Sequence, residues 1–203
     1  DFNEGARVLY GSLLHLTGDN YLQSNDDDGL EIQFNASLHS EDVVHSINNT
    51  DKGLALGYNS SAIVPDSFFD NNYYGIYAYH NASLYANAIS GSNNGKQGAY
   101  ISWGTSAHLA SSSFNNNAHD GTHTIYNANS YLASSESSSN GAGGMIGFNE
   151  GLVYASDTTA NNNAGYGYLI ARNSYMVLSN AIGNSNNVGV QVRDQSYLYD
   201  NAN

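Results

Sequence analysis

The stretch GIYAYHNASLYANAISGSNN, residues 75–94, decides the fold because its plan returns along the whole chain. It begins with Gly75, places an asparagine six residues later at Asn81, and ends with Asn94. The glycine recurs at intervals of 22 to 24 residues. The positions are Gly5, Gly29, Gly53, Gly75, Gly98, Gly121, Gly144, Gly167 and Gly189. A repeat of this length is typical of a solenoid or a repeat array.

Asparagine forms further columns in phase with the glycines. Six residues after most of them stands Asn or Gly, as at Asn35 and Gly104, and both residues tolerate the left-handed backbone of a sharp corner. Four residues before seven of the glycines stands another asparagine. These are Asn25, Asn49, Asn71, Asn94, Asn117, Asn140 and Asn163. We interpret them as a ladder of stacked, buried amides, because a single unpartnered amide would cost about 1–3 kcal/mol.

Within each repeat, apolar residues alternate with polar or aromatic ones, as in β-strands. Leu54 and Leu56 in one repeat, and Leu84 and Ala86 in the next, are examples. Residues 1–203 are therefore predicted to form one all-β domain, a right-handed parallel β-helix of about nine coils with three short strands each. Neither end has an obvious capping segment, so we expect a fragment of a longer chain.

The composition narrows the functional classes. The chain has 18 acidic and 5 basic residues and a formal net charge of -13, so we expect it to bind neither nucleic acid nor anionic membranes. It has no cysteine, which excludes a disulfide scaffold, and no apolar run of about 18 residues that could enter a bilayer. His108, His119 and His123 share no column, so the sequence predicts no metal site, and nothing in it indicates a cofactor.

The coil at residues 75–94, with its Tyr-, Asn-, Ser- and Ala-rich composition, resembles the right-handed β-helix of the pectate-lyase-like superfamily, as found in bacteriophage tail fibres and tailspikes. The resemblance covers essentially the whole chain. It implies a virion-tail or extracellular protein, commonly a homotrimer, that meets host surface polysaccharide. Many tailspikes also cleave that polysaccharide. The cleavage motifs are mostly missing, since NTD at residues 49–51 has no Gly-His-Gly partner and AHDG at residues 118–121 does not supply one.

The leading hypothesis is therefore a tail-fibre or tailspike segment that recognises host polysaccharide and serves as a rigid rod. Two alternatives stay open at this point. One is a polysaccharide-degrading hydrolase or lyase, and the other is the passenger domain of a secreted bacterial adhesin.

Hydrolysis of a glycan would need two carboxylates about 5–9.5 Å apart, and stacked coils offer such pairs. Asp42 and Asp66 both stand thirteen residues after their glycine, so stacking would bring their backbones about 4.8 Å apart. Glu136 and Asp157 lie on adjacent coils at nearby positions. These four are the candidate catalytic residues, with solvated surface acids, or a cation site at the first pair, as the alternative interpretations. A third pair, each two residues before a glycine, is Asp27 and Asp51.

Aromatic residues form two columns. The first, five residues after the glycines, shares the parity of inward positions, which predicts internal stacking. It comprises Tyr10, Phe34, Tyr58, His80, Trp103 and Tyr126. The second, ten residues after the glycines, has outward parity and, with tyrosines of the first strand, favours contact with sugar rings. The candidate glycan-binding residues are Tyr77, Tyr79, Tyr85, Tyr100, His108, Tyr131 and Tyr154. A trimer interface is the alternative for the second column.

Overall fold

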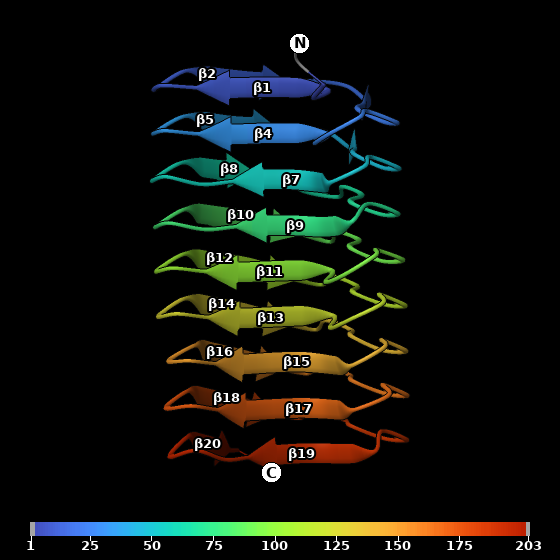
Figure 1. The fold of residues 1–203 in the computed structure, drawn as a ribbon, viewed down its shortest axis with the longest axis vertical. Coiled ribbons are helices and arrows are strands. Elements are labelled where there is room, and N and C mark those ends of the chain that lie inside the picture. Colours follow the sequence, from blue (N-terminus) through green and yellow to red (C-terminus); the bar gives the residue numbers. More distant parts are fainter. Residues whose placement is uncertain (1–2, 202–203) are drawn as a thin grey trace.

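The computed structural model describes residues 3–201, and within this part it consists of strands and turns with no helix. The chain winds into a parallel solenoid of about eight turns, stacked in sequence order along one axis (Figure 1). With no helix in the described range, none could cross a membrane. The predicted all-β parallel solenoid is confirmed, and its right-handed winding stays a prediction.

Two nine-stranded parallel sheets form the long faces of the solenoid. Sheet A, in front in Figure 1, comprises β1 (Ala6–Leu9), β4 (Leu30–Gln33), β7 (Lys52–Leu56), β9 (Tyr74–Ala78), β11 (Ala99–Ser102), β13 (Thr122–Ile125), β15 (Gly143–Phe148), β17 (Tyr166–Ala171) and β19 (Val188–Val192). Sheet B, behind it, comprises β2 (Leu13–Leu16), β5 (Ser37–Ser40), β8 (Ser61–Ile63), β10 (Ser83–Asn87), β12 (Ser106–Ala110), β14 (Asn129–Ala133), β16 (Leu152–Ser156), β18 (Tyr175–Ser179) and β20 (Tyr197–Asp200).

The third side of the coil has the least regular structure, although a strand was predicted there in each coil. In the described part of the chain, only β3 (Asn20–Tyr21) and β6 (Val44–His45) pair as strands there. From His45 onward, single-residue parallel bridges continue the column through Phe68, Ser90, Ser113, Glu136, Thr159 and Ile182.

Equal positions of successive coils pair directly. In sheet B, Leu84 pairs with Ala62 on one side and Ala107 on the other. In sheet A, Tyr100 pairs with both Tyr77 and His123. Each column found in the sequence is therefore a column of neighbouring residues along the rod.

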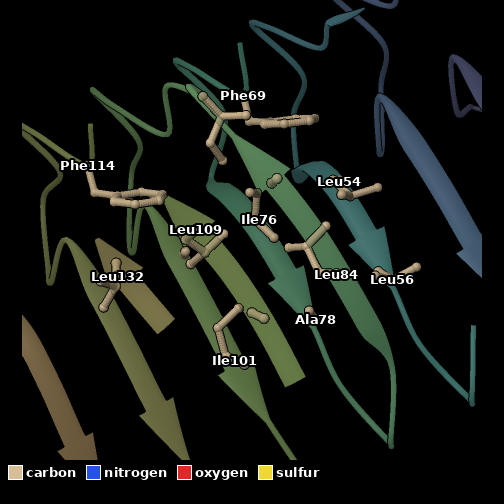
Figure 2. Packing of buried hydrophobic residues seen from close by; sticks show 14 of the residues in the cluster. Leu54, Leu56, Phe69, Ile76, Ala78, Leu84, Ile101, Leu109, Phe114 and Leu132 are labelled. Atoms are coloured by element: carbon tan, nitrogen blue, oxygen red, sulfur yellow. The ribbon is translucent and has the colours of Figure 1, made fainter. Parts of the chain in front are cut away.

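The inward positions of both sheets fill one continuous apolar core (Figure 2). Leu54 and Ile76 of sheet A are fully buried in the same cluster as Leu84 of sheet B, and Phe69 and Phe114 belong to it from the third side. Because each such residue packs on its counterparts in the coils above and below, burial of apolar surface is the main stabilising contribution.

The asparagine column is a continuous hydrogen-bonded ladder. The Oδ1 of each rung accepts a hydrogen bond from the backbone N–H of the preceding rung, at 2.8–3.1 Å. Several rungs also donate through Nδ2 to the same oxygen, as Asn94 does to Asn117 at 3.1 Å. The rungs are Asn25, Asn49, Asn72, Asn94, Asn117, Asn140, Asn163 and Asn186.

The prediction that Asn71 is a rung is wrong, because Asn71 is exposed and Asn72 takes its place in the ladder. Asn71 lies at the corner just before the rung, where its backbone is left-handed with φ of 57°. Asn72 stands three residues before Gly75 instead of four, so counting back from the glycine reaches the wrong residue. In a double asparagine, therefore, the first residue turns the corner and the second forms the rung.

The corner between sheets A and B consists of two consecutive residues with left-handed backbone. The second is mostly Asn or Gly, as predicted. The first is aromatic in six successive coils, with φ between 51° and 57°. Left-handed backbone breaks the alternation of a strand, and these rings lie at the surface, with Tyr10 76% and Trp103 48% exposed. The predicted inward placement of this column is therefore wrong.

Candidate functional site

A hollow of about 670 Å³ runs along the corner between sheets A and B. It extends from the coil of His80 to the coil of Arg172, roughly 19 Å along the axis at the strand spacing. Its walls combine aromatic rings, asparagines and two opposite charges. The lining residues are His80, Asn81, Trp103, Gly104, Tyr126, Asn127, Asn149, Glu150, Arg172 and Asn173.

The aromatic wall of the hollow is the end of the corner column. Six rings follow one another from Tyr10 to Tyr126, with centroids 4.3–5.7 Å apart. Neighbours cover the faces of the inner rings, so these rings offer mainly their edges to solvent. The rings end at Tyr126, because Asn149 and Arg172 hold the corner position in the next two coils. A ring-shaped ligand in the hollow would thus find a terminal aromatic face.

The charged residues of the hollow are not paired with each other. The Arg172 guanidinium lies 4.5 Å from the centre of the Phe148 ring. Neither Arg172 nor Glu150 takes part in a salt bridge within residues 3–201. A backbone hydrogen bond of 3.0 Å, from the Glu150 N–H to the Arg172 carbonyl, links the two residues. One cation, one anion and several amides are therefore available to a polar ligand.

Three of the predicted glycan-binding residues lie on the outer face of sheet A. Tyr77 stacks on Tyr100 with centroids 5.0 Å apart. Tyr79 accepts a hydrogen bond from Gln33 at 2.8 Å, and its ring contacts His80 beside the hollow at 5.2 Å. Burial raises the pKa of Tyr79 and of Tyr100 to about 12, so both hydroxyls remain protonated at neutral pH.

The other four lie on the outer face of sheet B. His108 stacks between Tyr85 and Tyr131, with both centroid distances 4.9 Å. Tyr154 pairs with Tyr131 in the next coil. The predicted residues thus fall on two separate faces, and none of them lines the hollow.

The polar residues of the hollow are absent from the functional residues predicted from the sequence. Asn149 and Arg172 occupy the aromatic column, and Glu150 follows Asn149 in a column of Asn and Gly. The sequence does distinguish these coils, because they are the ones in which the aromatic column is interrupted. The predicted inward placement of that column left these interruptions without a functional meaning.

All four predicted catalytic residues are exposed at the surface, and their catalytic role stays a prediction. Asp42 accepts a hydrogen bond from the Gly18 backbone N–H at 2.7 Å. Glu136 is level with Thr159 in the bridge column, so Asp157 lies two residues away from its neighbour position. Hydrogen bonds from Asn180 and Ser156 lower the pKa of Asp157, which therefore remains ionised and is unsuited to act as a general acid.

The third acidic pair belongs to a tighter cluster. Carboxylate oxygens of Asp27, Asp28 and Asp51 all lie within 4.8 Å of one another. The Lys52 ammonium sits among them, 2.5 Å from Asp51 and 3.3 Å from Asp28. Burial raises the pKa of Asp28 to about 6, against the opposing charge and hydrogen bonds of Lys52. The cluster is a partly buried ion-pair network, with the cationic position already filled by the lysine.

The raised pKa of Asp28 predicts a pH dependence of stability. The ordinary value is 3.8 and the folded value about 6, so the folded state binds this proton more tightly. The contribution of Asp28 is therefore most favourable below about pH 4 and declines as pH rises towards 6. Asp28→Asn should remove that decline and increase the free energy of unfolding at pH 7 by about 1–3 kcal/mol. Urea unfolding of the native chain and of Asp28→Asn at pH 4, 5, 6 and 7 measures the free energy of unfolding at each pH.

Asp26→Asn is the matched control, since Asp26 is exposed two residues away. It should leave the slope of unfolding free energy against pH unchanged between pH 4 and 6. If Asp28→Asn leaves the same slope as the native chain, Asp28 does not titrate as stated.

No protein-family model, curated protein or solved structure matches this chain.

Proposed function

We propose that this chain is a glycan-recognition segment of a bacteriophage tail fibre or tailspike, of the pectate-lyase-like β-helix type, and that it binds host surface polysaccharide along the corner hollow. In this role the solenoid is a rigid rod on a virion tail. The tyrosine column on the outer face of sheet B is then free for the subunit contact of a homotrimer, because tyrosine is enriched in such interfaces.

The observation that carries the proposal is the composition and shape of the hollow. It is long and open, which suits an extended polymer more than a compact metabolite. Tyr126, the last ring of the column, offers an aromatic face for the apolar face of a sugar ring, and Trp103 offers its exposed edge. Asn127 and Asn149 offer amide donors and acceptors for hydroxyl groups, and Arg172 adds a strong donor.

Binding is favoured over cleavage by the placement of the acids. Glu150 is the one carboxylate that lines the hollow, whereas glycoside hydrolysis uses a pair. The cluster of Asp27, Asp28 and Asp51 lies outside the hollow, and there Lys52 pairs with Asp28 and Asp51. A substrate in the hollow would meet one carboxylate and no partner for it.

Trp103 provides the test, because it is the only tryptophan of the chain and it lies in the hollow. Titration with purified bacterial capsular polysaccharides and lipopolysaccharides should change its fluorescence saturably for at least one glycan. Trp103→Ala should then weaken binding of that glycan at least about tenfold in calorimetry, as expected for a central aromatic contact.

Tyr10→Ala is the matched control, since Tyr10 belongs to the same corner column but lies outside the hollow. It should bind the glycan as the native chain does. Equal losses in both variants, or binding unaffected by Trp103→Ala, would place the glycan elsewhere. Release of reducing ends during the titration would establish cleavage and overturn the binding-only function.

A further inference from the structure

The outer face of sheet B carries a second group of chemically distinctive residues, far from the corner hollow. His15 in β2 and His39 in β5 pair directly across the two strands. Their ring centroids are 5.3 Å apart. Glu41 follows β5, and its Oε1 lies 2.9 Å from Nε2 of His15.

We propose that His15, His39 and Glu41 form a binding site for one divalent transition-metal ion. One ligand atom from each of the three side chains can be chosen so that all lie within 4.8 Å of one another. Two ligands of a tetrahedral zinc ion stand about 3.4 Å apart at usual bond lengths, so small side-chain rotations suffice to close the site. The sequence predicted no metal site, and that prediction rested on His108, His119 and His123. The site proposed here uses different histidines.

The backbone that carries the three ligands is rigid. Both histidines stand on paired strands of a nine-stranded sheet. The N–H of Glu41 donates to the carbonyl of Leu16 at 3.0 Å, which fixes the residue that follows β5 to the coil before it. The coils therefore hold the ligands at one level and one face, and only side-chain torsions remain to be set.

The ligand set selects the class of ion. Two imidazoles and one carboxylate suit Zn²⁺, Ni²⁺, Co²⁺ or Cu²⁺, whereas Ca²⁺ and Mg²⁺ prefer sites made of oxygen alone. The net charge of -13 favours cation binding in general. All three ligands are exposed, so the ion would keep at least one open position for water or an outside ligand.

The cluster of Asp27, Asp28 and Asp51 is similarly compact, but a basic side chain already lies among its carboxylates. At Asp27, Asp28 and Asp51 the Lys52 ammonium already neutralises the carboxylates. At Glu41, the only ion-pair partner within residues 3–201 is His15, itself a ligand of the proposed site. A metal ion at Glu41 therefore displaces no lysine or arginine from it.

Calorimetric titration of the EDTA-treated chain with ZnCl₂ tests the site. We expect one ion per chain, and His15→Gln or His39→Gln should each weaken binding at least about tenfold. Zn²⁺ should also raise the thermal midpoint of the native chain by linkage, but not that of His39→Gln. With Cu²⁺, electron paramagnetic resonance should report two nitrogen ligands in the native chain and one in His39→Gln.

His108→Gln is the control, because His108 lies in the same outer column of sheet B with tyrosines on both sides. It should bind Zn²⁺ as the native chain does. An equal loss in His108→Gln, a native affinity in His15→Gln, or no binding at millimolar ZnCl₂ would each overturn the proposal. None of these outcomes bears on the glycan site, which shares no residue with this group.

Discussion

Asn117→Leu is expected to lower the free energy of unfolding by about 2–6 kcal/mol, because two buried donors of Asn94 would lose their acceptor at about 1–3 kcal/mol each. Oδ1 of Asn117 accepts the backbone N–H of Asn94 at 2.9 Å and its Nδ2 at 3.1 Å. Both asparagines are at most 2% exposed, so water cannot replace the lost acceptor. Leucine is similar in size but offers no oxygen.

Urea unfolding followed by circular dichroism gives the magnitude, and amide hydrogen exchange gives the location. The N–H of Asn94 should lose protection first, since the damage is local to one step of the stack. Asn116→Gly is the control, because Asn116 is exposed, has φ of 58° and makes no rung. It should change stability by no more than about 0.5 kcal/mol. A similar stability for both variants would show that the ladder does not support the fold.

The same comparison in another coil tests the corrected register. Asn72→Leu should destabilise the chain as Asn117→Leu does, whereas Asn71→Gly should be nearly neutral. Asn71 was the residue chosen from the sequence, by counting back four positions from Gly75. A rule based on spacing fails wherever one coil is a residue shorter, while the local motif of a left-handed residue followed by a buried asparagine is retained.

Much of the fold follows from the sequence because a parallel solenoid makes every neighbour a counterpart one period away. The spacing of the glycines alone gives the pairing of Tyr77 with Tyr100 and of Leu84 with Ala107. Inward and outward positions within strands follow from alternation, and Leu54 and other predicted core residues are fully buried. Neither inference requires knowledge of contacts between residues far apart in the sequence, which usually cannot be predicted from a single sequence.

The corner aromatics were misplaced for a physical reason. Parity of side chains holds only while the backbone is extended, and Trp103 has φ of 53°. Aromatic residues rarely adopt this conformation, so a left-handed backbone at these positions could not be predicted from the residue type. The candidate site was missed with them, since Arg172 and Glu150 gain meaning only when that column is outside. Stacking between rings, in contrast, was predicted correctly, because it depends on the period and not on direction.

Gly98→Ala should destabilise the chain by about 3 kcal/mol or more, although glycine there has no left-handed backbone to accommodate. An added Cβ would lie 2.8 Å from the carbonyl oxygen of Gly121 in the next coil and closer still to that of Gly91. It would also lie 2.8 Å from Nδ2 of Asn117. The backbone atoms belong to paired coils and cannot move aside without separating them.

This geometry explains why glycine and asparagine recur together. An added Cβ at Gly53 would meet Nδ2 of Asn72, and one at Gly75 would meet Nδ2 of Asn94, at 2.7 and 2.8 Å. The amide of the next rung lies in the space that a side chain at the glycine would fill. The glycine and asparagine columns therefore depend on each other. Each rung can be buried only because a glycine stands against it.

Gly95→Ala is the control for Gly98→Ala. At Gly95 the nearest atom to an added Cβ is Cδ2 of Tyr73, at 3.2 Å, and a ring can rotate away. This variant should stay within about 1 kcal/mol of the native chain, helped by the lower entropy of the unfolded state. Amide exchange at Asn94 should accelerate in Gly98→Ala as in Asn117→Leu, because both changes disturb the same rung. If Gly98→Ala kept native stability and a protected Asn94, the coils could not be stacked as closely as the ladder requires.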